Sequence, residues 1–295
     1  MTALRLGWIG IGNMGLPICR NLLKAGFALT AYDIDPARVK LIAAGGAAPA
    51  TDLAGLAAAS DIVLSMVPND KVLLALAADL AGLLKPGQIF VDLSTISPAT
   101  SAQVAEMLAA SGAGYLRAPV SGSTANAANA SLSIYCSGPK AAFDRCLPAL
   151  QAIGSRQSHA GEAEEARILK LLINMVVCIT PAVVGEALAF GLRSGLQWDA
   201  MIDALNQSAA ASPLIGYKAE IMKRRDWAAM APVDLTAKDL DLALDWGRAR
   251  RVPMPFSALA QQINSGYQAS GDGQLDFFSV VTWPERLSSH APAKE

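Results

Sequence analysis

Residues 4–33 read LRLGWIGIGNMGLPICRNLLKAGFALTAYD, and this stretch decides the class of fold. An apolar run at Leu4–Ile9 has the length of a buried strand, and a second such run covers Ala28–Asp33. Between them lie a glycine-rich turn and an apolar stretch of helical length at Leu16–Ala25, which Gly26 ends. A strand, a turn, a helix and a second strand in this order predict an α/β protein with parallel strands.

The glycine-rich turn has a spacing that is typical of a dinucleotide-binding site. Its residues are Gly10, Ile11, Gly12, Asn13, Met14 and Gly15. The first glycine permits the tight turn, the second lets the backbone approach a pyrophosphate, and the third lets helix and strand pack closely. The N–H groups at the start of the helix would hold the anion. On the pattern alone, an ordinary glycine turn remains the alternative.

Asp33 ends the second predicted strand, roughly 20 residues after the glycines, where a carboxylate can accept hydrogen bonds from both ribose hydroxyls. The same carboxylate would repel a 2′-phosphate, so the sequence favours NAD over NADP as the cofactor. Asp35 and Arg38 follow closely and leave NADP open. A helix-capping or surface aspartate is the alternative interpretation.

The alternation of strands and helices continues through the first 150 residues. Further apolar runs cover Asp61–Val67, Ile89–Leu93 and Leu132–Cys136, and Lys71–Leu84 has the length and composition of a helix. This alternation predicts one parallel sheet with helices on both faces.

The pattern changes near Gly161. Residues 162–193 are predicted to form one long helix, with acidic residues in its first turn, where the helix dipole favours them. Its centre, Leu171–Val184, is apolar nearly all round and is predicted to be buried. The remaining chain is predicted to be helical, for example at Trp198–Asn206 and Ala237–Ala249. We therefore expect three parts: an α/β domain at 1–161, a connecting helix at 162–193 and an all-helical domain at 194–295.

Composition excludes several classes of protein. The chain has 295 residues, 53% of them hydrophobic, which rules out a disordered chain. Its net charge of −1 and its lack of a basic stripe argue against a nucleic-acid partner. The longest apolar run, Leu171–Gly185, is shorter than the ~20 residues that cross a bilayer, so no membrane span is expected.

The four cysteines form no CxxC pair, and the two histidines, His159 and His290, are too few to complete a metal site with them. We therefore expect no metal. The N-terminus has no basic start or cleavage site of a signal peptide, and cysteines without a CxxC pair suit a reduced protein, so a cytoplasmic protein is expected.

Two more turns follow predicted strands. Ligands of open α/β sheets bind beyond the carboxyl ends of the strands, so Thr95 and the turn of Met66, Val67, Pro68 and Asn69 should flank the cofactor. Separately, the small polar turn of Ser121, Gly122 and Ser123 could present N–H groups and hydroxyls to a carboxylate. Ordinary loops are the alternative for both.

Lys170 and Asn174 are four residues apart on the predicted long helix and therefore share one face. Loss of hydration in so apolar a helix favours the neutral form of a lysine, which can then exchange a proton with a substrate hydroxyl. The alternative is a lysine that extends from the edge of a buried helix to solvent. Lys238, Asp239 and Leu240 are predicted to begin an amphipathic helix, where a lysine is ordinarily a solvated charge.

These motifs together resemble the β-hydroxyacid dehydrogenase family. The resemblance covers nearly the whole chain, through Gly10–Gly15, Asp92–Pro98, Ala118–Gly122, Lys170 with Asn174, Lys238–Leu240 and Asp276–Ser279. It implies a Rossmann-type, doubly wound parallel sheet joined by a long helix to an all-helical C-terminal domain that helps form a homo-oligomer, a dimer or tetramer. It also implies NAD(P)-linked oxidation of a 3-hydroxy acid.

The resemblance also implies roles for individual residues. Lys170 would be the general acid/base, and Asn174 would orient the substrate or the lysine. Ser121, Gly122 and Ser123 would hold the carboxylate of a small-molecule substrate. Thr95 and Lys238 would contact the cofactor near the nicotinamide ribose. Histidine-based catalysis is disfavoured, because His159 precedes the long helix and His290 lies in the tail.

The chain departs from the family mainly in its substrate half. Glycines common in the family are replaced by Ser123, Asn126, Ala130, Glu164 and Ala166; Arg117 stands where an acidic residue is common, and Ile173 replaces an asparagine. These departures leave two alternatives open: a family member with a different substrate (a 3-hydroxy amino acid, a sulfonate or an imine), and an NAD-binding sensor without turnover. The particular acid and the direction of the reaction are not determined by the sequence.

Overall fold

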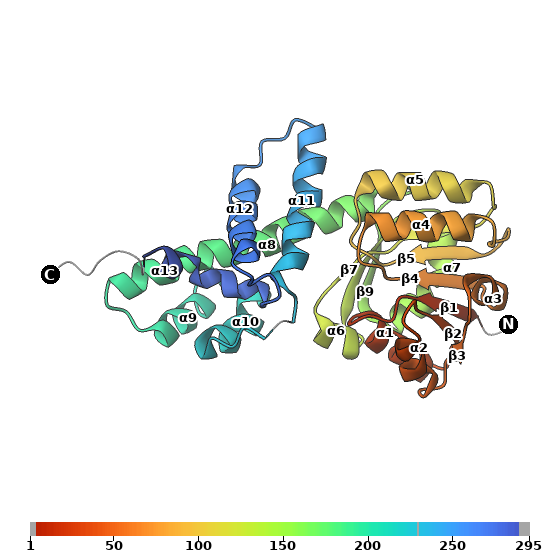
Figure 1. Ribbon diagram of the computed structural model, residues 1–295, viewed down its shortest axis with the longest axis horizontal. Coiled ribbons are helices and arrows are strands. Elements are labelled where there is room, and N and C mark those ends of the chain that lie inside the picture. The colour runs from red at the N-terminus through yellow and green to blue at the C-terminus, as the bar shows by residue number, and fades with distance from the viewer. Residues whose placement is uncertain (1–3, 229, 289–295) are drawn as a thin grey trace. The chain divides into compact units, whose positions relative to one another are not determined.

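The computed structural model describes residues 4–228 and 230–288. The chain forms two compact units that divide within one long helix, residues 1–170 and 171–295 (Figure 1). The separate connecting segment expected at 162–193 stays a prediction.

The first unit is built on a six-stranded sheet of order β3-β2-β1-β4-β5-β6, in which every neighbouring pair is parallel. The strands are β1 (Arg5–Ile9), β2 (Ala28–Tyr32), β3 (Ala48–Pro49), β4 (Ile62–Ser65), β5 (Ile89–Asp92) and β6 (Gly114–Arg117). Strand order reverses between β1 and β4, and ligands of such sheets bind at this switch point. The Rossmann-type sheet predicted from the sequence is confirmed.

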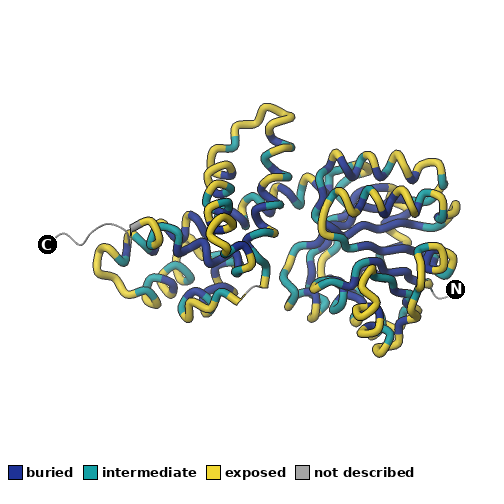
Figure 2. Tube along the Cα trace, in the orientation of Figure 1, coloured by how far each residue is buried: buried dark blue, intermediate teal, exposed yellow. Residues whose placement is uncertain are grey.

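Helices cover both faces of this sheet, as Figure 1 shows. One apolar core lies beneath α1 (Gly15–Lys24), α2 (Pro36–Ala43) and α7 (Lys140–Gln151), and a second lies beneath α3 (Leu53–Ala59), α4 (Asp70–Ala81) and α5 (Pro98–Ala109). The central strands β1, β4 and β5 and the edge strand β6 are buried at nearly every position, whereas β2 is only partly buried and β3 is exposed (Figure 2). Burial on both faces explains why these strands are continuous apolar runs in the sequence.

The run Leu132–Cys136 is a strand, β8, but the expectation that it joins the main sheet is wrong. It is the middle strand of a second sheet, antiparallel to β7 (Val120–Ser121) and parallel to β9 (Gly154–His159). The connection between β7 and β8 holds only the short helix α6 (Thr124–Ala128), which is too little chain for a parallel crossover but enough for an antiparallel return.

The second unit is helical in its described residues. It contains most of α8 (Glu165–Arg193), then α9 (Trp198–Asn206), α10 (Pro213–Arg224), α11 (Val233–Ala249), α12 (Pro255–Ala269), the 3-10 turn η1 (Phe277–Thr282) and α13 (Trp283–Ser288). A core of Leu188, Ile202, Met222 and Phe278 joins α8, α9, α10 and η1. Helix α11 starts earlier than predicted, so Lys238 lies in its second turn rather than at its beginning.

Helix α8 differs from prediction in two ways. It begins at Glu165, after the acidic residues Glu162 and Glu164, and only one of its faces is buried. Its apolar centre was predicted to be buried nearly all round, yet an apolar stripe on one side of the helix is exposed: Leu172 is 55% exposed, Val176 66%, Val183 59% and Phe190 77%. By length and composition α8 could cross a membrane. Core helices of water-soluble proteins meet the same criterion of length and composition.

Candidate active site

The glycine turn after β1 requires glycine at its first and last positions. Gly10 has a φ of +93°, and a Cβ on it would lie 2.3 Å from the carbonyl oxygen of Met66. A Cβ on Gly15 would lie 2.1 Å from the carbonyl oxygen of Gly10. Both are well inside van der Waals contact, so any side chain would force the turn open. Trp8 holds the turn from within the core, because its indole Nε1 donates to the Gly10 carbonyl at 2.8 Å.

The backbone at Gly12 and the start of α1 are open to a ligand. A Cβ on Gly12 would meet no atom of the described residues within 4 Å, so a ligand can approach this backbone. Within the described chain, no side chain caps the start of α1, whose N–H groups are thus available to an anion. Of the predicted contacts, Ile11, Asn13 and Met14 lie in this same turn.

Asp33 lies beside the glycine turn, as predicted. Its Oδ2 accepts a hydrogen bond from the N–H of Ile11 at 2.6 Å, and its Oδ1 accepts one from the N–H of Asp35 at 2.8 Å. These two donors orient the carboxylate, and each oxygen keeps a lone pair for a ribose hydroxyl. The residues present therefore fit the adenosine half of a nicotinamide dinucleotide.

The turns after β4 and β5 are tied to each other. The N–H of Val67 donates to the hydroxyl of Ser94 at 2.8 Å. Pro68 and Asn69 complete the first turn, and the side chain of Asn69 caps α4 by accepting from the N–H of Val72 at 3.0 Å. Thr95 directly follows Ser94, so both predicted turns lie beyond the carboxyl ends of neighbouring strands.

The turn of Ser121, Gly122 and Ser123 connects β7 to α6, and Gly122 has a φ of +135°. Two residues here that replace glycines of the family, Ser123 and Asn126, form hydrogen bonds with each other. The side-chain oxygen of Asn126 accepts from both the backbone N–H and the hydroxyl of Ser123, each at 2.9 Å. Ala130 has a φ of +51°, a backbone conformation in which the glycine usual for the family would be unstrained.

Two further departures also compensate each other. Arg117, at the end of β6, donates to Glu164 through Nε at 2.9 Å and Nη2 at 2.5 Å. The Arg117 guanidinium also lies 4.4 Å from the ring centre of Tyr115. The side chains of Arg117 and Glu164 are 7% and 13% exposed. An arginine in place of the family's acidic residue is therefore neutralised by a glutamate in place of its glycine.

Lys170 lies in the second turn of α8 and is half-buried. Asn174 follows one turn later and is 8% exposed. Its Nδ2 donates to Asp239 Oδ2 at 2.6 Å, and Lys238 Nζ lies 2.9 Å from the other oxygen of the same carboxylate. Asp239 therefore fixes the orientation of the Asn174 amide through its Nδ2.

Sequence reasoning missed Asp239 and Arg167 as residues of this region. Asp239 stands within a motif that the sequence singled out only for its lysine. Arg167 is wholly buried and donates to Asp92 Oδ2 at 2.5 Å. A lysine or arginine in an apolar helix gives no signal of the carboxylate it will meet, because that partner is far away in the sequence.

Other reactive side chains have structural surroundings. His159 Nε2 lies 2.8 Å from the carbonyl oxygen of Gly138, and its ring packs against Phe143; His290 lies outside the described residues. All four cysteines are buried and outside any disulfide, and burial raises the pKa of the Cys136 and Cys146 thiols to about 12. Among residues 4–228 and 230–288, no cluster of three or more His, Cys, Asp or Glu side chains could hold a metal ion.

The fold and the glycine turn define an NAD(P)-binding oxidoreductase with a Rossmann-type domain followed by a helical domain. Comparison with known families agrees. Residues 5–164 match the family described as the NAD binding domain of 6-phosphogluconate dehydrogenase, and residues 165–283 match the NAD-binding region of NADP-dependent 3-hydroxyisobutyrate dehydrogenase. The chain belongs to the β-hydroxyacid dehydrogenase family, of the 3-hydroxyisobutyrate dehydrogenase type, which confirms the resemblance seen in the sequence.

Individual relatives cover nearly the full length of the chain. It is 33% identical to 2-(hydroxymethyl)glutarate dehydrogenase of Eubacterium barkeri, over 97% of this chain and 96% of that protein. It is also 33% identical to 3-hydroxyisobutyrate dehydrogenase of Pseudomonas aeruginosa, over 93% of this chain and 96% of the relative. Among solved structures, Mycobacterium tuberculosis 3-hydroxyisobutyrate dehydrogenase with L-serine has a TM-score of 0.89 at 26% identity, covering 97% of this chain and 100% of that one.

Proposed function

We propose that this protein catalyses the reversible, NAD-dependent oxidation of a small 3-hydroxy acid to its semialdehyde or keto acid. The observation that carries the proposal is the Asp33 carboxylate, which accepts from the peptide N–H of Ile11 in a turn whose first and last glycines, Gly10 and Gly15, leave no room for a side chain. Membership of the β-hydroxyacid dehydrogenase family supports the class of reaction.

The preference for NAD over NADP rests on charge. The Asp33 carboxylate would face the ribose 2′-hydroxyl of a bound cofactor, and Ile34, which follows it, is uncharged and 92% exposed. The nearby cation, Arg38, donates to the carbonyl oxygen of Ile11 at 3.0 Å and lies 3.6 Å from Asp35. Its charge is therefore partly neutralised, and a 2′-phosphate would face the Asp33 carboxylate.

The remaining cofactor contacts are proposed from the turns at the carboxyl edge of the sheet and from the resemblance. They are the glycine turn (Gly10, Ile11, Gly12, Asn13, Met14, Gly15), the turn of Val67, Pro68 and Asn69, Thr95, and Lys238. When bound, the nicotinamide ring would accept the hydride that leaves the substrate carbon.

The protein's own groups would bind the acid and move its proton. The hydroxyl of Ser121 and the backbone of Gly122 would hold the substrate carboxylate; Ser123 would join them once its hydroxyl leaves Asn126. Lys170 Nζ would accept the hydroxyl proton as the C–H bond gives up hydride and the C=O bond forms, and it would return that proton in reduction. Asn174, one turn along α8, would orient the substrate or the lysine through Oδ1. Such an arrangement would bring the acid, the base and the hydride acceptor together, and this positioning would supply much of the rate.

A panel of acids tests the proposal. The purified protein is assayed with 3-hydroxyisobutyrate, 2-(hydroxymethyl)glutarate and L-serine, each with NAD+ and with NADP+, and reduced nicotinamide is followed by absorbance. We expect turnover of at least one acid, with kcat/KM for NAD+ above that for NADP+ by about tenfold or more, which corresponds to roughly 1.4 kcal/mol. NADH binding by fluorescence without turnover of any hydroxy acid would instead support a sensor.

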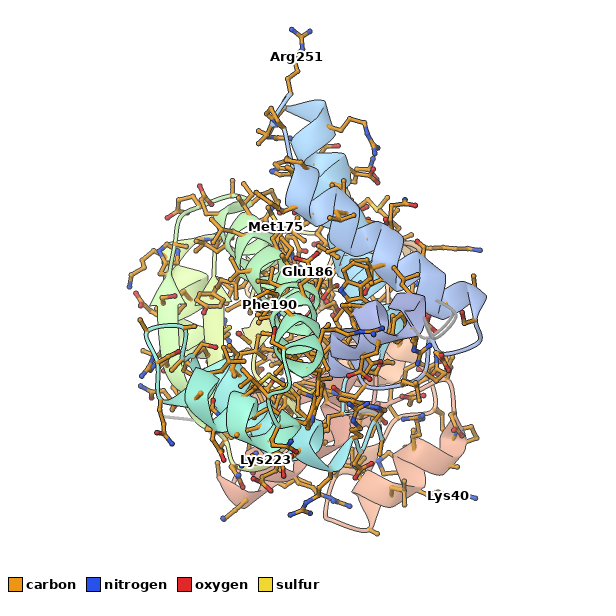
Figure 3. All side chains as sticks on the ribbon, turned by 90° about the vertical axis from the view of Figure 1, so that its left-hand side faces the viewer. Lys40, Met175, Glu186, Phe190, Lys223 and Arg251 are labelled. Carbon is orange, nitrogen blue, oxygen red and sulfur yellow. The ribbon has the colours of Figure 1, made fainter. Side chains whose placement is uncertain are left out.

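We also propose that the protein is a homo-oligomer, a dimer or tetramer, that associates through the exposed stripe on α8. The stripe consists of Leu172, Val176, Val183 and Phe190, each more than half exposed. Phe190 and the neighbouring Glu186 can be followed on α8 in Figure 3. A row of large apolar side chains on one helix face is costly in water, and a second copy of the same helix would cover it.

Replacing Val176 and Val183 together by glutamate should convert the oligomer to a chain of 30.6 kDa, because four buried charges would meet in a dimer interface. Light scattering coupled to size exclusion measures the mass. The matched control is Leu41→Glu on α2, an equally exposed leucine (56%) outside the stripe, which should leave the mass unchanged. A wild-type protein of single-chain mass would contradict the proposal.

The cytoplasm is the compartment that we propose, because all four cysteines are buried thiols outside any disulfide, which suits a reducing environment.

A further inference from the structure

Arg167, in the first turn of α8, is the centre of a buried polar network. Its side chain is wholly buried and donates four hydrogen bonds. Nη1 donates to the carbonyl oxygen of Ser94 at 2.6 Å, and Nη2 to Asp92 Oδ2 at 2.5 Å and to the Tyr115 hydroxyl at 3.1 Å. Nε donates to the Ser101 hydroxyl at 3.3 Å. One guanidinium thus joins α8 to β5, to β6 and to α5.

The network continues into both turns at the carboxyl edge of the sheet. The second oxygen of Asp92 accepts from the hydroxyls of Ser65 and Ser94, each at 2.7 Å. The same Ser94 hydroxyl accepts from the N–H of Val67. Asp92 therefore sets the positions of the turn at Val67–Asn69 and of the segment Ser94–Thr95, which are the turns proposed to hold the cofactor.

Lys170 is mechanically linked to this network through the helix. It follows Arg167 by three residues, a rise of about 4.5 Å along a continuous α-helix. A helix behaves as a rigid rod over so short a span, so a shift of α8 at Arg167 moves Lys170 by a similar amount. Because the Arg167 guanidinium donates both to the Asp92 carboxylate and to the Ser94 carbonyl oxygen, α8 has little freedom to shift in this way.

A buried ion pair of this kind is poorly explained by stability alone. The desolvation of two buried charges largely offsets their attraction, and packed hydrophobic residues of similar volume often do as well. What an ion pair with four directed hydrogen bonds adds is a defined position for the groups that it joins. At this site those groups are the base-bearing helix and the two cofactor turns.

We infer that Arg167 is a positioning residue for the reaction: through Asp92 and Ser94 it fixes the distance between Lys170 and the cofactor turns. The inference rests on the proposed function, since it concerns the placement of the proposed base. Arg167 itself touches neither substrate nor cofactor in this scheme.

The decisive variant is Arg167→Gln, which keeps a hydrogen-bonding side chain but removes the fork and the charge. We expect kcat to fall about 100-fold, the scale of a misplacement of about 1 Å, whereas KM for the acid changes less than threefold. Arg167→Lys retains the charge and should recover part of kcat. The matched control is Lys218→Gln, which breaks a buried pair in the second unit (Lys218 1%, Asp276 0% exposed) and should lower thermal stability with little effect on kcat.

A second readout does not depend on turnover. Modification of the Lys170 amine by trinitrobenzenesulfonate, followed by peptide mass spectrometry with NADH present, reports the surroundings of that nitrogen. We expect the rate at Lys170 to change at least threefold in Arg167→Gln and to stay at the wild-type rate in the Lys218→Gln control.

A folded Arg167→Gln protein with wild-type kcat and wild-type modification at Lys170 would overturn the inference. If that variant fails to fold, Tyr115→Phe decides, because it deletes one contact of Arg167 and keeps both charges: altered modification of Lys170 supports the inference, and unaltered modification overturns it. Failure of the proposed function would be seen in a different experiment. A protein in which Lys170→Met keeps turnover refutes the base, whatever the modification rates in the Arg167 variants.

Discussion

Replacing Lys170 by methionine should abolish turnover while leaving cofactor binding intact. Methionine has a similar length and stays compatible with an apolar helix, but it cannot accept a proton. Loss of a general acid/base lowers the rate by about 10²–10⁴-fold. The Kd for NADH, measured by fluorescence titration, should stay within about twofold, because the glycine turn and Asp33 lie elsewhere in the first unit. The substrate is the best acid of the panel described above.

An exposed lysine provides the control for this result. Lys140 is 57% exposed and pairs with Asp144 on the surface of α7, so Lys140→Met should keep full turnover. Near-normal kcat/KM in Lys170→Met would show that the lysine is not the base. A loss of NADH binding in that variant would assign Lys170 to the cofactor site instead.

Reversing the charge of Arg117 should strongly lower stability. Arg117→Asp would leave two carboxylates in the place of an ion pair with half-buried Glu164 and would remove the guanidinium from the Tyr115 ring. Breaking a buried pair in this way costs about 3–5 kcal/mol of unfolding free energy. The double variant Arg117→Asp/Glu164→Gly restores the pattern common in the family and should recover most of that loss. Urea unfolding of the two single variants and the double variant gives the coupling energy.

A surface pair supplies the reference for this cycle. Arg248 and Asp245 on α11 are 76% and 71% exposed, so Arg248→Asp should cost less than about 1 kcal/mol. If the double variant at positions 117 and 164 is no more stable than Arg117→Asp alone, the two departures do not compensate each other.

The elements around β1 are those that the sequence predicted best. The glycine turn, Asp33 and the neighbouring strands were predictable because their roles depend on local spacing: a turn of defined length, a helix that follows it and a strand that returns. The limits of α9, Trp198–Asn206, were predicted as the structure has them. The main sheet was predicted from its continuous apolar runs, because a parallel sheet covered by helices on both faces buries such runs.

The short and polar elements were missed for a related reason. Strand β9 reads GSRQSH and has no apolar alternation, so only its pairing with β8 identifies it as a strand. Strand β6 ends in Arg117, and a charged residue does not indicate a buried strand. Its charge is tolerated there because it donates hydrogen bonds to Glu164. Apolar patterning records which residues avoid water but not which strand will lie beside them.

The class of fold, the position of the dinucleotide turn and the family could be inferred from the residues alone, because each rests on residues whose spacing along the chain sets their chemistry. Which charges meet could be learned only from the folded chain. Arg167 with Asp92, Arg117 with Glu164 and Asn174 with Asp239 join residues 75, 47 and 65 positions apart. It also showed that one face of α8 is exposed. The physical reason is the same in each case: burial and charge pairing depend on distances in space, and those are set only when the packed elements bring distant segments together.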